Sequence, residues 1–242
     1  MSEDLVQLPK RSRLPETPRL VLTLALAGLL SGLAIVGAYR LTLPTIEANN
    51  AQALREAVFK VLPGAERLQR LVWKDGHMVP AEGASADEPS VYAGYTADGK
   101  FVGYAIPAAG AGFQDTIRLI YGFDPAKERI VGMEVLESRE TPGLGDRIYD
   151  DEHFHHQFLD LAVKPTVELV KHEPTAPNQV DAITGATISS TAVVKIVNSG
   201  NQEWLSRLPK AGAAPPLAPE GKKPPVPTAL PQRGGPIPGG KQ

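Results

Sequence analysis

The sequence of 242 residues contains no cysteine. This absence excludes disulfides, zinc sites made of thiolates and any iron–sulfur cluster ligated by the chain's own cysteines. It is neutral about compartment, because many extracytoplasmic domains also lack disulfides. A strong excess of either charge is missing too, since the formal net charge is −2 and the pI about 6.2. Bulk charge therefore gives no support for a nucleic-acid partner, and we expect none.

Sequence signatures of hydrolases are also absent. The chain has neither the Gly-x-Ser-x-Gly nucleophile elbow nor the His-Glu-x-x-His zinc motif. Three histidines do lie close together, at His153, His155 and His156, but only residues three or four apart share a helix face. His153 and His156 meet that condition, and no third ligand follows at a suitable spacing. We interpret this segment as a solvated polar face and expect neither a catalytic residue nor a metal site in the chain.

One long hydrophobic run stands near the N-terminus. Residues Leu20 to Tyr39 contain no charged side chain, and a helix of that length spans the roughly 30 Å hydrocarbon core of a bilayer. A cleaved signal peptide ending near Ala38 is the alternative, but its apolar region is usually only about 7–15 residues long. The length favours a retained anchor. Positive charges precede the run, at Lys10, Arg11, Arg13 and Arg19. This distribution predicts a cytoplasmic N-terminus and an extracytoplasmic main domain.

The rest of the chain is long enough for one α+β domain with an antiparallel sheet flanked by helices. Pro44 predicts a short rigid connection between the membrane helix and this domain. Hydrophobic periodicity predicts helices at 46–62, at 151–163 and after residue 187. Alternating or β-branched runs predict strands at 68–73, 116–123, 130–136 and 167–171, and a hairpin at 90–104 whose Asp-Gly pair suits a type I′ turn.

Composition changes abruptly after residue 208. The last 34 residues hold 10 of the 23 prolines, 6 glycines and few large apolar side chains. Such a segment cannot bury enough surface to offset its chain entropy, so we expect a disordered tail. The predicted organisation is a cytoplasmic segment (1–19), a transmembrane helix (20–39), an extracytoplasmic domain (40–208) and this tail (209–242).

The segment 181–187, Asp-Ala-Ile-Thr-Gly-Ala-Thr, leads into an apolar run with helical spacing. Its plain interpretation is a turn followed by a capped helix, with Thr187, Ser189 and Ser190 as candidate N-caps. The free N–H groups of a helix start also favour an anion. A phosphate esterified to a hydroxyl there would be held well, and the small residues before Thr187 leave room for a bulky group. Composition alone leaves both interpretations open.

A second loop, Glu-Thr-Pro-Gly-Leu-Gly at 140–145, follows the predicted strand that ends near Leu136. By itself it reads as a Pro-Gly turn that connects a strand to a helix. Its glycines would also let the backbone come close to a ligand.

Together the two motifs resemble those of the FMN-binding domain family. That family includes the G subunits of Rnf-type electron-transport complexes and the C subunits of the sodium-pumping NADH:quinone reductase. The resemblance covers roughly residues 20 to 205. It departs from the family's usual Gly-Tyr-Gly-Gly-like stretch at 112–115, where this chain has Gly-Phe-Gln-Asp, so no site is assigned there.

The resemblance implies a set of site residues for a covalently bound FMN. The flavin phosphate would be esterified to Thr187, with Thr184, Gly185 and Ala186 as cofactor-binding neighbours and Asp181 as part of the maturation motif. The second loop would pack near the isoalloxazine ring through Glu140, Thr141, Gly143 and Leu144.

The implied function is electron relay in a membrane-bound, ion-translocating ferredoxin/NADH oxidoreductase complex of the Rnf type. Expected partners are the other subunits, a flavin transferase that uses FAD and a divalent metal during maturation, and the lipid of the bacterial cytoplasmic membrane. Three alternatives stay open: a C-type subunit of the sodium-pumping reductase, a free-standing anchored flavoprotein that feeds an extracytoplasmic reductase, and a structural subunit without flavin.

Overall fold

The computed structural model describes residues 16–81, 83–85, 88–209 and 216. The chain divides into two units, one ending at Ile46 and the other beginning at Glu47. The predicted cytoplasmic segment lies almost wholly outside the described residues, and so does the predicted disordered tail.

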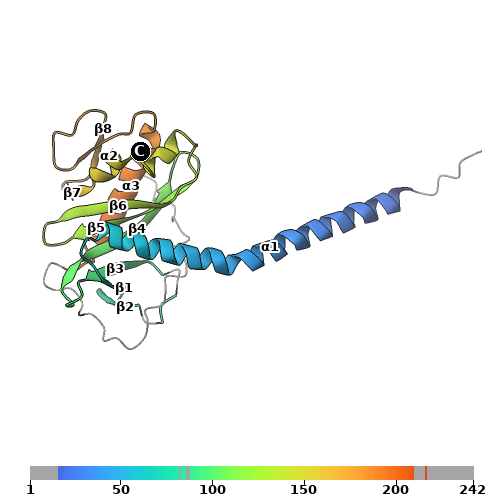
Figure 1. The fold of residues 1–242 in the computed structure, drawn as a ribbon, viewed down its shortest axis with the longest axis horizontal. Helices are drawn as coiled ribbons and strands as arrows, with labels where there is room; N and C mark the ends of the chain where they lie inside the picture. Colours follow the sequence, from blue (N-terminus) through green and yellow to red (C-terminus); the bar gives the residue numbers. More distant parts are fainter. Residues whose placement is uncertain (1–15, 82, 86–87, 210–215, 217–242) are drawn as a thin grey trace, which may run out of the picture. The chain divides into compact units, whose positions relative to one another are not determined.

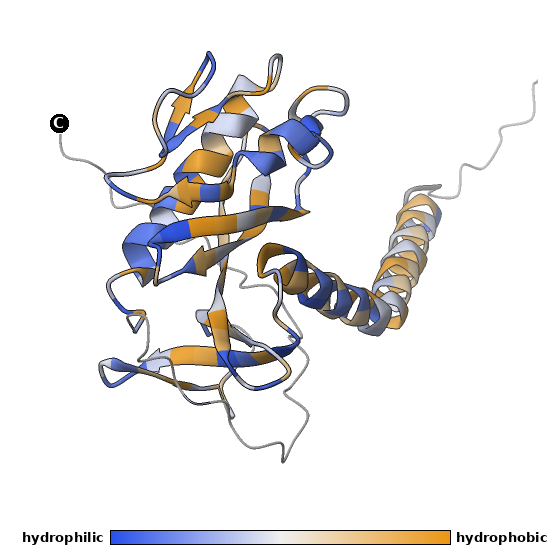
Figure 2. Cartoon of the chain, turned by 60° about the vertical axis from the view of Figure 1, so that its left-hand side comes forward, coloured by the Kyte–Doolittle hydropathy of each residue, from blue (hydrophilic) through white to orange (hydrophobic). Residues whose placement is uncertain are grey.

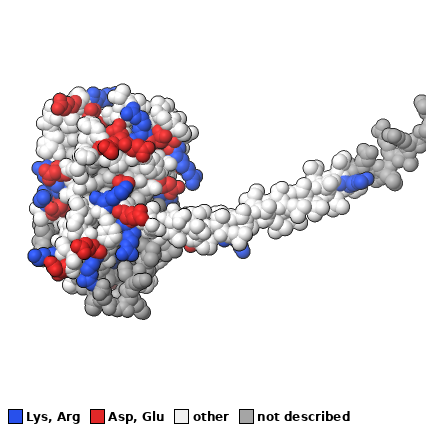
Figure 3. All heavy atoms as spheres, viewed as in Figure 1, with Lys and Arg blue, Asp and Glu red and all other residues white. Residues whose placement is uncertain are grey.

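The first unit is the N-terminal part of one long helix, α1 (Glu16–Val61). Almost every side chain from residue 18 to 46 is exposed, and charge is sparse on this segment (Figure 3). Among the described residues it is the one helix long and apolar enough to cross a membrane. The predicted rigid connection at Pro44 is itself helical, because α1 runs through this residue. A proline removes one N–H donor, and the turns on both sides keep their own hydrogen bonds.

The second unit is built on a seven-stranded sheet whose strands run in the order β2-β1-β3-β4-β5-β6-β7 (Figure 1). Every neighbouring pair is antiparallel, so the sheet is nearly a meander. A separate parallel pair joins β8 to β9. The strands are β1 (Arg67–Lys74), β2 (His77–Pro80), β3 (Ser90–Tyr95), β4 (Phe101–Ala111), β5 (Thr116–Asp124), β6 (Arg129–Glu137), β7 (Leu159–Ala162), β8 (Glu168–Val170) and β9 (Gln179–Asp181).

Each face of this sheet is covered by a helix. The last turns of α1 bury Leu54, Val58 and Leu62 against Tyr92 and Ile120 on one face. On the other face, α3 (Thr187–Trp204) packs across β4 and β5 and joins the larger core. The hydropathy colouring shows apolar residues along the strands between these helices (Figure 2). Because both faces are covered, the strands are more continuously apolar than a half-exposed sheet would require.

The close contact between α1 and the sheet depends on missing side chains. Gly122 on β5 pairs with Gly132 on β6, and a Cβ atom at Gly122 would overlap with the Val61 carbonyl oxygen. A Cβ atom at Gly132 would lie 3.1 Å from the Cα of Val61. The end of α1 therefore rests directly on the backbone of the sheet.

The predicted helix at 151–163 is wrong in its second half. Helix α2 (Glu152–His156) ends after little more than one turn, and β7 follows it. Phe154 and Phe158 are fully buried, as their helical spacing predicts. The chain then pairs with the edge of β6. Hydrogen bonding to the backbone groups of that edge outweighs the local helical pattern.

The other predicted helices and strands of the domain are present, with one correction of detail. The turn between β3 and β4 is not type I′, which requires positive φ at both central residues. Here Gly99 has a φ of 77°, whereas the φ of Asp98 is not positive. The strands β2 and β9 were not predicted. The fold class, an N-terminal apolar helix followed by an antiparallel sheet with flanking helices, is confirmed.

Candidate functional site

A tight turn precedes helix α3. The Ala186 N–H donates to the Ile183 carbonyl at 2.9 Å, and Gly185, the third residue of this turn, has a φ of 86°. A type II turn requires positive φ at that position, which a glycine adopts without strain. The sequence Thr-Gly-Ala therefore turns the chain so that the next residue can begin a helix.

The start of α3 differs from the predicted arrangement. Thr187 is the first helical residue, and the N-cap is Ala186, which has no side chain able to cap. The first hydrogen bond of the helix runs from the Ser190 N–H to the Ala186 carbonyl. Because no side chain caps the helix, the N–H groups of its first residues, those before Ser190, stay available to bind a ligand. Together with the helix dipole, these groups favour an anion.

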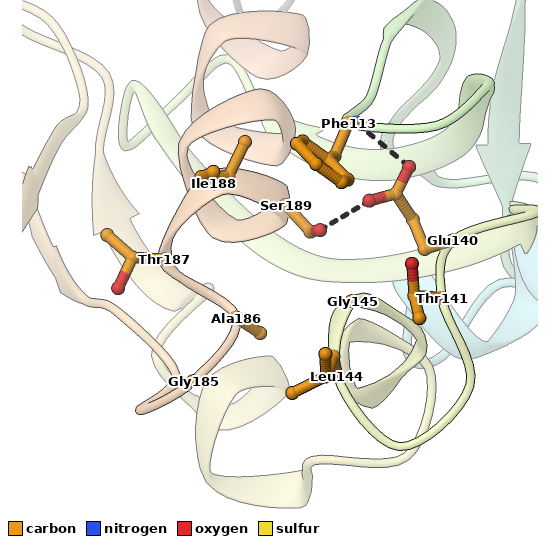
Figure 4. Close-up of a pocket in the computed structure, with 10 residues that line it drawn as sticks. All are labelled: Phe113, Glu140, Thr141, Leu144, Gly145, Gly185, Ala186, Thr187, Ile188 and Ser189. Atoms are coloured by element: carbon orange, nitrogen blue, oxygen red, sulfur yellow. Dashed lines mark hydrogen bonds between the residues drawn. The ribbon is translucent and has the colours of Figure 1, made fainter.

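The hydroxyl groups near this helix start have different roles. Ser189 donates to a carboxylate oxygen of Glu140 at 2.5 Å. Ser190 donates to the Ala186 carbonyl at 3.0 Å, and Thr191 donates to the Thr187 carbonyl at 2.7 Å. Within the described part of the chain, the Thr187 hydroxyl has no such partner. It points away from Glu140 in Figure 4, and the residue is half-buried.

The second motif, the loop at 140–145, is compact and leads into a short helix, η1 (Gly145–Ile148). The Leu144 N–H donates to the Thr141 carbonyl at 3.1 Å, and Gly143 between them has a φ of 77°. This loop is tied to the first motif by Arg147, whose guanidinium donates to the Thr184 carbonyl at 2.8 Å. The two motifs, about 40 residues apart in the sequence, are neighbours in space.

Glu140 links three segments of the chain. Its carboxylate accepts hydrogen bonds from the backbone N–H groups of Phe113 at 2.9 Å and Gln114 at 3.0 Å, besides the bond from Ser189. The side chain is only 5% exposed. The strand-end loop at 112–115, the loop at 140–145 and the first turn of α3 therefore meet at one carboxylate (Figure 4).

Two glycines make room for this carboxylate. A Cβ atom at Gly145 would lie 2.6 Å from the Ser189 Oγ and 2.8 Å from Glu140 Oε2. A Cβ atom at Gly112 would overlap with Glu140 Oε1. In the Gly-Leu-Gly sequence, Gly145 is thus required for a close approach to Glu140, whereas Gly143 shapes the turn.

The environment of Glu140 keeps it ionised. Burial raises the pKa of its carboxyl, but hydrogen bonds from the Ser189 hydroxyl and the backbone N–H groups of residues 113 to 115 outweigh burial, so the pKa lies below its ordinary value of 4.5. At neutral pH the site therefore contains a buried negative charge.

These segments surround a hollow of about 330 Å³. Three large apolar side chains on its wall are mostly exposed: Phe113 at 64%, Leu144 at 53% and Ile188 at 60%. Such residues are normally buried, and several in one pocket indicate a binding surface. The lining consists of Phe113, Glu140, Thr141, Leu144, Gly145, Gly185, Ala186, Thr187, Ile188 and Ser189.

Most of the predicted site residues come together here. Six of them line the hollow: Glu140, Thr141, Leu144, Gly185, Ala186 and Thr187. Three others do not. Gly143 shapes its loop, Thr184 lies in the turn before α3, and Asp181 ends β9, where its N–H donates to the side chain of Gln157 at 2.5 Å.

Sequence reasoning missed four lining residues, namely Phe113, Gly145, Ile188 and Ser189. Phe113 lies in the stretch to which no site was assigned. An exposed phenylalanine in a Gly-rich loop is a weak signal, and its role depends on a contact with Glu140 that no local pattern shows. Gly145 and Ser189 belong to the motifs, and only their distances to Glu140 reveal their role.

The hollow has the features that a flavin phosphate ester needs. Apolar side chains suit a flat aromatic ring system, and an uncapped helix start suits a phosphate. A threonine hydroxyl without a competing partner in the described chain lies at that helix start. The residues present therefore fit an aromatic ligand with a phosphate group.

Comparison with known proteins agrees with this geometry. Residues 112–202 match the family described as FMN-binding domain. The chain is 32% identical over 189 residues to the G subunit of the ion-translocating oxidoreductase complex of Methanosarcina acetivorans, covering 76% of this chain and 92% of that protein. It is 31% identical to the G subunit of the Na(+)-translocating ferredoxin:NAD(+) oxidoreductase complex of Acetobacterium woodii, covering 67% of this chain and 79% of that protein.

Solved structures support the fold. The crystal structure of NqrC from Shewanella oneidensis superposes with a TM-score of 0.52 at 16% identity, covering 66% of this chain and 97% of that one. The C subunit of the Na(+)-translocating NADH-quinone reductase of Parabacteroides distasonis gives the same TM-score at 19% identity, covering 66% of this chain and 93% of that one. The match to the family model and the extent of the matches to the G subunits establish that the chain belongs to the FMN-binding domain family, among the G subunits of ion-translocating oxidoreductase complexes.

Proposed function

We propose that the protein carries FMN joined by a phosphoester to Thr187 and relays electrons within an ion-translocating oxidoreductase complex. The observation that carries the proposal is the Thr187 hydroxyl, which has no hydrogen-bond partner in the described chain and stands at an uncapped helix start beside an apolar hollow. The hydroxyls of Ser189, Ser190 and Thr191 are engaged with the protein itself, so within the first turns of α3 the Thr187 hydroxyl is the one available for attachment.

Attachment is a transfer reaction. The Thr187 oxygen attacks the FMN phosphorus of FAD, the phosphoanhydride bond breaks, AMP leaves, and the hydroxyl proton passes to solvent. A separate flavin transferase with a divalent metal would catalyse this step, because the described chain has no base placed to activate Thr187. The product phosphate would face the free N–H groups at the start of α3.

Once loaded, the flavin supplies the redox chemistry and the protein supplies its position and electrostatic surroundings. The apolar wall of Phe113, Leu144 and Ile188 would exclude water from the ring. A covalent bond suits an extracytoplasmic domain, where a lost cofactor could not easily be replaced. The proposed partners are the other subunits of the complex and the surrounding lipid.

The proposed orientation follows from the charges beside the membrane helix. Four basic residues precede the apolar run, and the N-terminus is therefore assigned to the cytoplasm. The flavin domain, at 40–208, lies on the extracytoplasmic side in this arrangement. In this proposal, residues 20–39 form the single anchor. Segment 1–19 lies in the cytoplasm, and segment 209–242 is the C-terminal tail that follows the flavin domain.

The test is the mass of the full-length protein, purified with its complex and then denatured. We expect an increase equal to FMN less one water, and fluorescence of the band in a denaturing gel. Thr187→Ala should remove both signals. Thr191→Ala is the matched control, one helical turn further on, and it should keep both.

Flavin that remains attached to the Thr187→Ala protein would refute the assignment. A wild-type protein of unmodified mass, purified from cells that contain the transferase, would refute covalent attachment altogether. Circular dichroism of each variant shows whether the fold is kept, so a loss of label through unfolding is distinguished from a loss of the attachment site.

A further inference from the structure

The Glu140 carboxylate carries a buried negative charge that no cation neutralises in the described structure. None of the ion pairs there includes Glu140. The adjacent Arg139 is turned outward, with its side chain 71% exposed, and pairs with Asp115 at 3.6 Å and Glu137 at 3.5 Å. Only neutral donors, the Ser189 hydroxyl and backbone N–H groups, bind the carboxylate. They stabilise the ionised form but leave its full charge in place.

This charge lies on the wall of the hollow beside exposed apolar side chains. An interaction between charges is weakly screened where water is excluded, so a carboxylate here acts on a bound ligand more strongly than one at the surface. A carboxylate bound by the Ser189 hydroxyl and by several backbone N–H groups has no need of a cation for its own stability. The arrangement therefore preserves a negative potential in the hollow.

We propose that Glu140 sets the reduction potential of the bound flavin by keeping a fixed negative charge beside it. The inference rests on the proposed function, because it requires FMN in this hollow. Reduction adds electrons to the flavin ring, and a nearby negative charge opposes any increase in its negative charge. Glu140 therefore lowers the midpoint potential and makes the flavin a stronger electron donor.

A purely structural role makes a different prediction. Glu140 also holds three segments together, so its loss could change the potential by moving the walls of the hollow. The two roles separate because one partner of the Glu140–Ser189 bond carries charge and the other does not. Glu140→Gln removes the charge, while the amide oxygen can still accept from the N–H groups of Phe113 and Gln114 and its NH₂ can donate to Ser189 Oγ. Ser189→Ala keeps the charge and breaks the bond between the segments.

The experiment is a spectroelectrochemical titration of the FMN-loaded, full-length protein and these two variants at neutral pH. We expect the midpoint potential of Glu140→Gln to move in the positive direction. Ser189→Ala should leave it unchanged or move it slightly in the negative direction, because the carboxylate then loses one donor that partly offsets its charge. The mass of each denatured protein is measured first. Flavin missing from the wild type as well would count against the proposed function, whereas flavin missing only from Glu140→Gln would count against the role inferred for Glu140.

An unchanged or more negative potential in Glu140→Gln would overturn the inference, and so would an equal positive shift in Ser189→Ala. A folded Glu140→Gln protein that carries no flavin would assign Glu140 to maturation instead, which also overturns it. If Glu140→Gln does not fold, the pair Glu140→Asp and Glu140→Asn repeats the comparison with two side chains of equal length that differ in charge. The aspartate variant should then have the lower potential of the two.

Discussion

At the scale of single residues, similar side chains in one short segment have separate tasks. Ser189 binds the Glu140 carboxylate, and Ser190, fully buried, accepts from the Ile183 N–H at 3.2 Å while it donates to Ala186. These bonds hold the turn and the helix start in place. The Thr187 hydroxyl, by contrast, has no hydrogen-bond partner in the described chain. The first turn of α3 therefore contains one available nucleophile, Thr187, and two structural residues, Ser189 and Ser190.

The charge of Glu140 makes the stability of the domain depend on pH. Because its pKa in the folded protein is below the ordinary value of 4.5, the carboxylate stabilises the fold at pH above that value. The contribution is lost as the pH falls through the folded pKa. We expect the wild type to exceed Glu140→Gln in free energy of unfolding at neutral pH, and the difference to shrink below about pH 4.5, near the pKa of an unperturbed glutamate.

The measurement is urea unfolding in detergent, followed by tryptophan fluorescence, at a series of pH values from neutral to about pH 3, below the unperturbed carboxyl pKa. The exposed charged residues near the site, such as Arg139 and Asp115, are the same in both proteins. A difference that stays constant across this range would contradict the ionised state assigned to Glu140.

At the scale of elements, the contact between the end of α1 and the sheet depends on backbone packing. The paired Gly122 and Gly132 leave no gap between Val61 and the strands. A larger residue at this place cannot be accommodated by a rotamer change, because the atom it would meet belongs to the backbone. An added methyl group therefore displaces the whole helix end.

We expect Gly122→Ala to lower the free energy of unfolding by about 1–3 kcal/mol, the usual range for overpacking. Gly37→Ala is the control, because a Cβ atom there meets nothing within 4 Å. Chemical unfolding of both variants in detergent checks the prediction. Equal stability of the two variants would show that the helix end is loosely packed on the sheet.

At the scale of the whole molecule, the absence of cysteine gives a direct test of orientation. Ser2→Cys and Gln202→Cys each introduce the single thiol of the chain, and Gln202 is exposed on α3. With the proposed topology, a membrane-impermeant maleimide should label Gln202→Cys in intact spheroplasts. It should label Ser2→Cys only after the membrane is permeabilised. Labelling in the reverse order would place the flavin domain in the cytoplasm.

Much of the molecule could be predicted from local pattern. The strands β3 to β6, the final helix and the membrane-length apolar run all have a strong periodicity or length of their own. The predictions failed where a long-range interaction outweighs the local one. At 159–162 the open edge of β6 recruits a strand in place of the predicted helix.

By itself, the sequence determined the fold class, the apolar anchor and the two motifs, because each depends on residues that are neighbours in the chain. Only the tertiary structure decided that these motifs share one hollow, that Phe113 belongs to it and that Ser189 binds Glu140. The reason is physical. A carboxylate that collects donors from loops at 112–115 and 140–145 and from α3 exists only once the sheet has brought those segments together.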